Sequence, residues 1–503
     1  MYLLALPGVG RHIVPLEDDA GDKMDADGSL REEFSRVDKD MPRHVSRVRR
    51  LLRQPSSSQQ DIGIQECAEL VAKLYEEVGC EKVEVVRTKG NPVVYGECKG
   101  DSDRTLLGYF MYDTMPFNEP GWDHPAMGAK VVDKRLPAGK VKAIVNRGAD
   151  NTKGPLAAFL NSVDACNRSV GRPPVNLLLV AEGEEELGSP NLPPYVRKDK
   201  RRLSRADACY FPYFSQEADG KAHFCLGVKG VVYFELKASG RAWGRGPQEF
   251  AIHSGQKAWV DSPAWRLIDA LATMTEDNGN RVRIDGFYDK VAPPSEEDEE
   301  LIARLAERFD PKAYKAVMKV KRFTLPEDDP EALIKRFVFG TTLNIDGIWG
   351  GYTEKGSKTV LPHEATCKID IRLVPNQEKD EMMPLVRKHL DSHGYGDIEM
   401  KEIDTGYDCC RASVKEPVVQ SMLASYRAFG HDPDVWPTSG GAVPFYVFNK
   451  VLGLPFTMGC LGHSSLAHSP NEYMVLEGNR KVAGLAEAEK FMIHFMDGFG
   501  HSG

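Results

Sequence analysis

GYFMYDTMPF, residues 108–117, predicts a buried strand that runs into a loop carrying one acid, Asp113. Alternate residues along a strand point to the same side, so Met111 faces whatever Asp113 faces. A histidine at position 111 would suggest a metal ligand oriented by the nearby carboxylate, whereas a methionine does not. This stretch therefore raises the question of which chemistry Asp113 serves.

Strands and helices alternate on both sides of this stretch. IQECAELVAKLYEEVGC (64–80) has apolar residues at helical spacing and a glycine near its end, and GPLAAFLNSVDAC (154–166) is a second helical segment. Short β-rich or apolar runs predict strands at 82–88, 92–98, 104–112, 140–146 and 175–182. The alternation predicts an α/β fold with a mostly parallel sheet flanked by helices.

The middle of the chain has a different pattern of predicted helices and strands. A helix is expected from about Pro263 to Met274, and IDIRLV (369–374) alternates as a half-buried strand does. These features predict a smaller α+β unit inserted into the α/β domain. An acidic, flexible lead-in is expected to become helical near Leu30. The predicted division is a lead-in at 1–40, the α/β domain at 41–227 and 409–503, and the inserted unit at 228–408.

The composition is that of an ordinary globular protein. The 503 residues are 41% hydrophobic and 28% charged, with a net charge of −9. This acidic balance argues against nucleic acid and anionic membranes as partners, and no apolar run approaches the roughly 20 residues of a membrane span. The ten cysteines include no CxxC pair, which predicts reduced thiols in a cytoplasmic protein. For the adjacent pair Cys409–Cys410, a redox role stays open beside plain packing.

Four stretches carry the candidate chemistry. Besides Asp113, they are the loop NRGADNTKGPLAAF (146–159), the strand end AEGEEELGS (181–189) and LAHSPNE (466–472). The carboxyl ends of parallel strands are where α/β sheets place their ligands. We therefore expect these stretches to meet at one edge of the sheet.

Together with GIWGGYTEKGSKTVLP, RLVPNQ, IHSG and SGGAVP, these stretches resemble the M20 family of dinuclear zinc amidohydrolases and dipeptidases. The texture is nearest to the carnosinase-like branch, and the resemblance extends from about residue 40 to the end. It implies an M20-type catalytic domain, discontinuous in sequence, with an inserted α+β lid that mediates homodimerisation. The inserted unit at 228–408 would be this lid.

At three of the family's metal positions this chain carries other residues. Met111 stands where the first histidine is expected, and Asn151, two places before a Lys-Gly, stands where an aspartate bridges the two metals. Tyr213 aligns best with a further acidic ligand. These three side chains would instead line the substrate site.

The resemblance leaves four residues in the family's catalytic positions. Glu185 matches the general base and Asp113 the orienting acid, while Glu186 and His468 match metal ligands. Neutral groups at the other positions would relieve the repulsion among these acids. We expect the remaining carboxylates to share a proton, as acid–base chemistry uses.

Further residues match the family's substrate contacts. His253 in AIHSG corresponds to the lid histidine that reaches the partner subunit's site, and Asn344 to a polar contact there. Arg372 matches the arginine for the substrate carboxylate, with a structural ion pair as its alternative. Gly440 and Gly441 would offer backbone N–H groups to the same carboxylate, or form only a tight turn.

The mixture of thioether, amide, phenol, carboxylate and imidazole suits no single common metal. The sequence therefore predicts no cofactor, with a single zinc on Glu186 and His468 as the alternative. The predicted function is an enzyme that acts on a small amino-acid-like or dipeptide-like carboxylate by carboxylate acid–base catalysis without dinuclear zinc. The open alternatives are a metal-independent racemase or epimerase, another isomerase, lyase or cyclase, a residual mono-zinc amidohydrolase or dipeptidase, and a non-catalytic binding protein.

Overall fold

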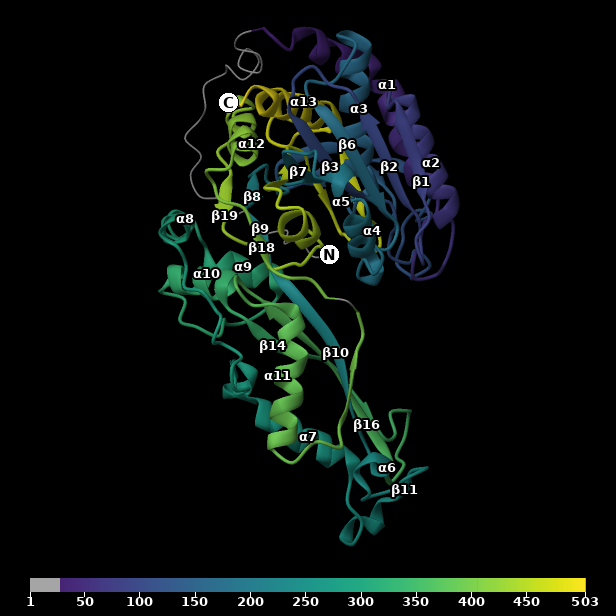
Figure 1. The fold of residues 1–503 in the computed structure, drawn as a ribbon, viewed down its shortest axis with the longest axis vertical. Helices are drawn as coiled ribbons and strands as arrows, with labels where there is room; N and C mark the ends of the chain where they lie inside the picture. Colours follow the sequence, from purple (N-terminus) through teal and green to yellow (C-terminus); the bar gives the residue numbers. More distant parts are fainter. Residues whose placement is uncertain (1–27, 405, 503) are drawn as a thin grey trace. The chain divides into compact units, whose positions relative to one another are not determined.

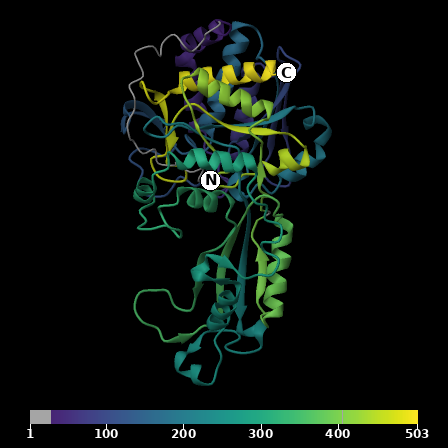
Figure 2. The same ribbon diagram turned by 90° about the vertical axis from the view of Figure 1, so that its left-hand side faces the viewer.

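A computed structural model describes residues 28–404 and 406–502, and Figures 1 and 2 draw the chain as a ribbon. The chain forms two units, of which the second comprises 229–295 and 335–409. The rest of the chain, including 296–334, belongs to the first unit. The continuous insertion over 228–408 stays a prediction, because the contacts group 296–334 with the first unit although the sequence inserts it among residues of the second. Most of the expected lead-in lies outside the described residues, and helix α1 (Arg31–Arg53) begins close to the expected position.

The first unit is organised around a six-stranded sheet. Its strand order is β1-β2-β6-β3-β7-β20. The bonds from β6 to β20 are parallel, whereas β1 and β2 are antiparallel to their neighbours. The strands are β1 (Lys82–Val86), β2 (Val93–Cys98), β3 (Thr105–Met111), β6 (Asn176–Glu182), β7 (Ala208–Phe214) and β20 (Phe456–Cys460).

The central strands form because their sequences are nearly continuous apolar runs. TLLGYFM in β3 and NLLLVAE in β6 are buried along almost their whole length, as strands covered on both faces are. Helix α3 (Lys153–Ser169) packs against β3 and β7, and α2 (Ile64–Glu77) packs against β1 and β2. Helices α12 (Pro417–Ala428) and α13 (Leu485–His501) pack together and against β20 (Figure 1).

A second sheet in this unit holds the loop that carries His468. Its order is β21-β22-β5-β4, and all its bonds are antiparallel. The strand predicted at 140–146 lies here, and not in the central sheet. The members are β4 (Lys130–Leu136), β5 (Gly139–Val145), β21 (Ser464–Ser465) and β22 (Tyr473–Glu477). Residue His468 lies between β21 and β22 with a φ of 61°.

Segment 296–334 contributes two further helices to the first unit. They are α8 (Glu296–Ala306) and α9 (Pro311–Met318). Helix α8 packs against β19 (Asp434–Trp436), which pairs in parallel with β8 (His223–Cys225). Helix α10 (Pro330–Phe339) follows where the chain passes into the second unit.

The second unit is an antiparallel sheet covered by helices. Its order is β14-β16-β10-β17, with α7 (Pro263–Met274) packed on β10 and β16. Helix α7 has the bounds expected from the sequence, and α11 (Lys379–Ser392) packs on β10. The strands are β10 (Gly230–Ser239), β14 (Thr342–Gly350), β16 (Glu364–Leu373) and β17 (Glu399–Glu402). The α/β class with an α+β insertion is thus confirmed.

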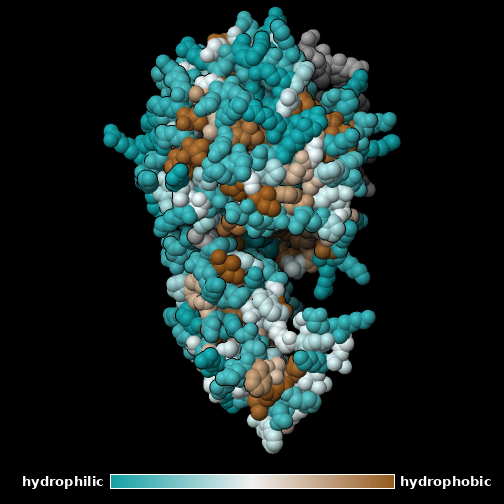
Figure 3. All heavy atoms as spheres, turned by 90° about the vertical axis from the view of Figure 1, so that its right-hand side faces the viewer, coloured by the Kyte–Doolittle hydropathy of each residue, from teal (hydrophilic) through white to brown (hydrophobic). Residues whose placement is uncertain are grey.

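Hydrophilic residues dominate the face drawn in Figure 3, and hydrophobic ones lie in separate groups. Across residues 28–404 and 406–502, no helix has both the length and the apolar character that a membrane crossing requires. A disulfide joins Cys80 to Cys98. The prediction that all ten cysteines stay reduced was therefore wrong for this pair, while Cys409 and Cys410 are buried.

Candidate active site

The candidate site begins where β3 and β6 end side by side. These strands are parallel, and Met111 pairs with Glu182 at their carboxyl ends. Asp113 follows β3, while the chain leaving β6 turns into a short 3-10 helix over Glu185–Leu187. The expected meeting of these two stretches at one sheet edge is therefore present in the structure.

Asp113 anchors the turn that carries the glutamates. Its carboxylate accepts hydrogen bonds from Ser58 Oγ at 2.7 Å and from the backbone N–H groups of Glu185 and Glu186 at 3.2 and 3.1 Å. The side chain is almost fully buried. Burial, followed by the charge of Glu186, raises the pKa of Asp113 to about 7 despite these hydrogen bonds. Asp113 thus fixes the positions of both glutamates through their backbone.

Glu182 is a second buried acid beside this turn. It accepts hydrogen bonds from Tyr109 Oη at 2.5 Å and Ser189 Oγ at 2.9 Å. Burial raises the pKa of Glu182 to about 8, and the charge of Asp113 acts in the same direction. At neutral pH this carboxyl therefore holds a proton.

Three of the predicted site residues are in direct contact. The Asn151 amide donates to Glu186 Oε1 at 2.7 Å and lies 2.9 Å from His468 Nε2. His468 Nε2 is 3.2 Å from the same Glu186 oxygen. Asn151 comes from the loop before α3, Glu186 from the turn after β6, and His468 from the loop before β22. Tertiary folding alone brings these three polar groups to one point.

Glu185 and Glu186 differ in charge although they are neighbours. Burial, then the charge of Glu186, raises the pKa of Glu185 well above its ordinary value. Burial would also raise the pKa of Glu186, but the hydrogen bond and charge of His468 outweigh it and lower the pKa. Over the described part of the chain, no side chain or backbone group donates to the Glu185 carboxyl. It is therefore placed to exchange a proton with a bound molecule.

Two acids missed in the sequence hold the loops of Asn151 and His468. Glu472 accepts from the backbone N–H groups of Asp150 and Asn151 at 2.8 and 2.9 Å and pairs with Arg147 at 2.9 Å. Burial, then the charge of Asp150, raises the pKa of Glu472 to about 7. Asp150 accepts from Ser464 Oγ at 2.5 Å and from the backbone N–H of Ala467 at 3.1 Å, next to His468.

The sequence did contain a signal for these supporting acids. Glu472 is the last residue of LAHSPNE, Asp150 precedes Asn151, and Glu182 precedes the glutamate cluster. Each lies within a stretch already singled out. Their roles were missed because each acid accepts hydrogen bonds from groups whose positions depend on the fold. Contacts between segments far apart in sequence decide those positions.

Two predicted site residues are buried at the ends of their strands. Met111 is 1% exposed, and its backbone carbonyl accepts from Thr152 Oγ1 at 3.3 Å. Tyr213 is 6% exposed at the end of β7, and its ring lies 6.2 Å from that of His223. Burial, followed by the charge of Cys225, raises the pKa of Tyr213 well above its ordinary value. Tyr213 thus remains a neutral phenol.

Two predicted substrate contacts lie together in the second unit. Arg372 Nε donates to Asp370 at 2.8 Å, and Asn344 Nδ2 lies 3.2 Å from the other oxygen of that carboxylate. The structure therefore contains the ion pair that was the alternative for Arg372. The Arg372 side chain is 38% exposed, so part of its guanidinium stays accessible.

The other predicted contacts lie in exposed or loop positions. His253 is exposed, accepting from the Gly255 N–H at 3.0 Å and lying 3.2 Å from Thr359 Oγ1. Gly440 and Gly441 follow β19 in a loop of the first unit, and the Gly441 N–H donates to Ser439 Oγ at 3.1 Å. That N–H thus already has a hydrogen-bond partner within the turn.

At the contact of Asn151, Glu186 and His468, a carboxylate and an imidazole lie side by side. Glu186 Oε1 and His468 Nε2 are 3.2 Å apart, close to the ~3.3 Å between two ligands bound at ~2.0–2.1 Å to one tetrahedral zinc. Carboxylate and imidazole are ordinary zinc ligands, and the Asn151 amide supplies a third oxygen when its O and N are exchanged. Around this contact, Met111 offers a soft thioether and Asn151 a neutral amide.

A second group of potential ligands lies under α1. One ligand atom from each of Asp40, His44 and Asp164 lies within 4.8 Å of the others. Arg43 forms ion pairs with both aspartates of this group, and Arg47 lies 3.2 Å from Asp164. A cation bound here would therefore compete with arginines.

Comparisons with known proteins agree with the resemblance found in the sequence. Residues 226–398 match the M20 peptidase dimerisation domain. The chain is 32% identical to an M20 family metallo-carboxypeptidase from Sulfolobus solfataricus, covering 91% of this chain and 99% of that one with a TM-score of 0.80. It is 26% identical over 477 residues to a Cys-Gly metallodipeptidase of Schizosaccharomyces pombe, covering 89% and 95% of the two chains. It is 29% identical over 410 residues to the human Beta-Ala-His dipeptidase, covering 78% and 76%.

These findings correct the expectation about cofactors. Relatives that match over most of this chain are metallodipeptidases, and the described residues include the ligand group Asp40, His44 and Asp164. The prediction of no cofactor was therefore wrong. It failed because other residue types at three of the family's metal positions were taken to exclude a bound metal.

Proposed function

Because this chain belongs to the M20 family, we propose that it is a metal-dependent dipeptidase that hydrolyses the amide bond of small dipeptides. The family and the peptidase class are shared with relatives that cover most of the chain. The observation that carries the proposal is the Glu185 carboxyl, buried and without a hydrogen-bond donor among residues 28–404 and 406–502. It lies beside Glu186, whose Oε1 is 3.2 Å from His468 Nε2.

Glu185 is the acid–base residue in this proposal. Burial and the charge of Glu186 raise the pKa of Glu185 well above its ordinary value, and a raised pKa is how a carboxyl is adapted to general acid–base catalysis. Glu185 takes a proton from the attacking water and gives it to the leaving amine. Asp113 keeps Glu185 in place through its backbone N–H. The adjacent Glu186 stays ionised because His468 lowers its pKa.

Glu186 and His468, with the Asn151 amide oxygen, would hold one divalent cation. When bound, such an ion polarises the substrate carbonyl and lowers the pKa of water. Neutral Asn151 adds no second negative charge beside Glu186. Glu472 keeps the Asn151 backbone in position by accepting its N–H.

We also propose a substrate carboxylate contact and a dimer. Arg372 offers the accessible part of its guanidinium, which suits a carboxylate. The match to a dimerisation domain supports a homodimer through the second unit. Large apolar side chains there are exposed, with Trp259 at 82%, Phe250 at 68% and Trp265 at 59%.

The test is hydrolysis of Cys-Gly and β-alanyl-histidine by protein freed of metal and then given one equivalent of Zn²⁺. We expect turnover only after Zn²⁺ is added, and a loss of about 10²–10⁴-fold in kcat for Glu185→Gln. Glu184→Gln is the matched control, because Glu184 binds the loop groups Asn91 N and Asn191 Nδ2. Equal turnover with and without Zn²⁺, or by Glu185→Gln and wild type, would contradict the proposal.

A further inference from the structure

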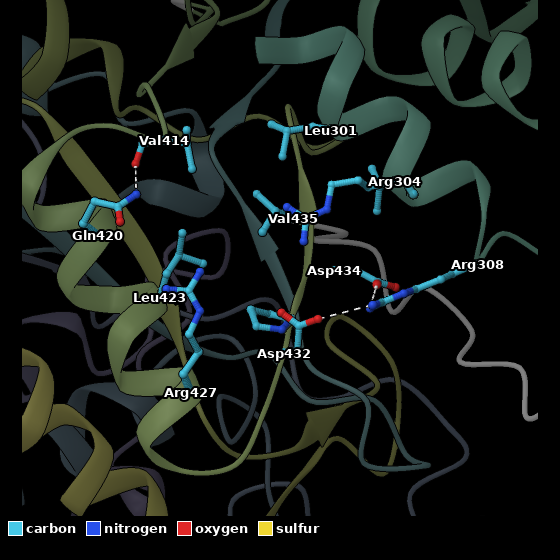
Figure 4. Close-up of a pocket in the computed structure, with 12 residues that line it drawn as sticks. Leu301, Arg304, Arg308, Val414, Gln420, Leu423, Arg427, Asp432, Asp434 and Val435 are labelled. Carbon is cyan, nitrogen blue, oxygen red and sulfur yellow. Dashed lines mark hydrogen bonds and ion pairs between the residues drawn. The ribbon is translucent and has the colours of Figure 1, made fainter. Parts of the chain in front are cut away.

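A small cavity lies in the first unit where the segment 296–334 packs onto it. Its volume is about 100 Å³, and α8, α12, β19 and the loop before β19 line it. Figure 4 shows that side chains from α8 and α12 approach it from opposite sides. Nothing proposed above for the dipeptidase reaction uses its residues.

Each helix presents an apolar residue and an arginine to this cavity at helical spacing. On α8 these are Leu301 and Arg304, with Leu305 one turn on, and on α12 they are Leu423 and Arg427. The three leucines are buried, at 8%, 5% and 3% exposed. The cavity therefore has an aliphatic floor with a guanidinium on either side.

The charges around the cavity are not balanced. Arg308, at its edge, is 3.2 Å from Asp432 and 3.3 Å from Asp434. For Arg304 and Arg427, by contrast, the described part of the chain supplies no hydrogen-bond acceptor or ion-pair partner. Two positive groups thus face one cavity while the acids there are already paired. An anion bound at this cavity would supply these two exposed guanidinium groups with an acceptor.

We propose that this cavity binds a small aliphatic carboxylate, with the carboxylate between Arg304 and Arg427 and the hydrocarbon chain on the leucines. Guanidinium groups match the geometry of a carboxylate, and the floor favours a hydrocarbon over a bare oxyanion. A water molecule needs ~10–15 Å³ of such space. The 100 Å³ available therefore holds a short branched chain, not a peptide or nucleotide.

Binding here would strengthen the packing of α8 on the first unit. The start of α8 is already fixed, because Glu297 accepts from Arg411 at 2.7 Å and from Ser413 Oγ at 2.8 Å. The cavity lies one to two turns further along the helix. A ligand that contacts both α8 and α12 adds a second attachment point.

The experiment is calorimetric titration of the full chain with 4-methylpentanoate, together with hydrogen exchange of α8. We expect saturable binding, slower exchange of α8 amides, and a loss of affinity of about tenfold or more in Arg304→Gln and in Arg427→Gln. Arg480→Gln, an exposed arginine outside the cavity, is the matched control and should bind like wild type. A second titration with leucine shows whether the cavity accepts an α-amino acid or only a carboxylic acid without an amino group.

Three results would overturn the proposal. One is the absence of saturable binding by either carboxylate. Another is equal binding of the neutral 4-methylpentanamide, which would remove the role of the charge. The third is inorganic phosphate binding as tightly as 4-methylpentanoate, which would remove the role of the aliphatic floor. Circular dichroism and the thermal midpoint of each arginine variant show whether it is folded.

Discussion

Two clusters of buried acids in the first unit have opposite charge environments. Under α1, Asp40 and Asp164 are surrounded by cations: Arg36, Arg43 and Arg168 pair with Asp40, and Arg43 and Arg47 with Asp164. At the strand ends, Asp113, Glu182 and Glu185 have mainly backbone, hydroxyl or no donors. The residue types are alike, and the partners differ.

The two environments move the pKa values in opposite directions. Burial would raise the pKa of Asp164, but the hydrogen bond of His44 and the charge of Arg47 outweigh it and lower the pKa to about 2. Asp113 and Glu182, without such partners, have pKa values raised to about 7 and 8. The first cluster contributes fixed ion pairs, and the second holds mobile protons, as functional sites do.

The strongest test of this comparison is where a divalent cation binds. We expect His468→Gln to weaken Zn²⁺ binding strongly. Loss of an outer-shell partner typically costs about 10–100-fold in metal affinity, and loss of a direct ligand should cost more. His44→Gln should leave that affinity unchanged, because arginines already neutralise Asp40 and Asp164. The measurement is Zn²⁺ titration against a competing chelator. If His44→Gln weakened Zn²⁺ binding and His468→Gln did not, the metal site would be the cluster under α1.

The next test compares the clusters by stability. Asp164→Asn should lower the free energy of unfolding by about 3–5 kcal/mol, since it leaves buried cations without their acid. The effect should be present above the unfolded pKa of Asp164, near 4, and vanish as the pH falls through about 2. Urea unfolding at pH 7 measures it. A loss below 1 kcal/mol would show that Asp164 is not the acid that balances these cations.

Glu182→Gln tests the protonated state of the strand-end acids. A raised pKa stabilises the fold below the unfolded value of 4.5, and this contribution is lost as the pH rises through about 8. Between pH 5 and pH 9, the free energy of unfolding of the metal-free wild type should therefore fall by a few kcal/mol relative to that of Glu182→Gln. The glutamine keeps an acceptor for Tyr109 and Ser189. Parallel pH profiles of the two proteins would mean that Glu182 is ionised throughout.

The smallest expected effect concerns the arginine–acid pair of the second unit. Arg372 forms an ion pair with Asp370, and its side chain is 38% exposed, so part of the guanidinium stays available. Arg372→Gln should raise KM for a dipeptide about 10–100-fold with little change in kcat, as expected when a charged hydrogen bond is lost. A dipeptide amide lacking the carboxylate should show no such difference. An equal KM change for both substrates would assign Arg372 a structural role only.

Most of the fold was predictable because its signals are local. Apolar runs such as those of β3 and β6, and the helical spacing of α2, α7 and α12, appear in the sequence where the structure has these elements. The segment 296–334 lies in sequence between residues of the second unit, and this position gives no information about its packing. Only the contacts of α8 with β19 place it in the first unit.

The sequence by itself determined which acids meet at the strand ends, because parallel strands joined by helices bring their carboxyl ends to one edge. The tertiary structure alone decided what each acid does there. In sequence, Ser58 lies 55 residues from Asp113, and His468 lies 282 residues from Glu186. No local sequence pattern therefore predicts these partners. Charge state depends on burial and on partners from distant segments, and these exist only once the chain has folded.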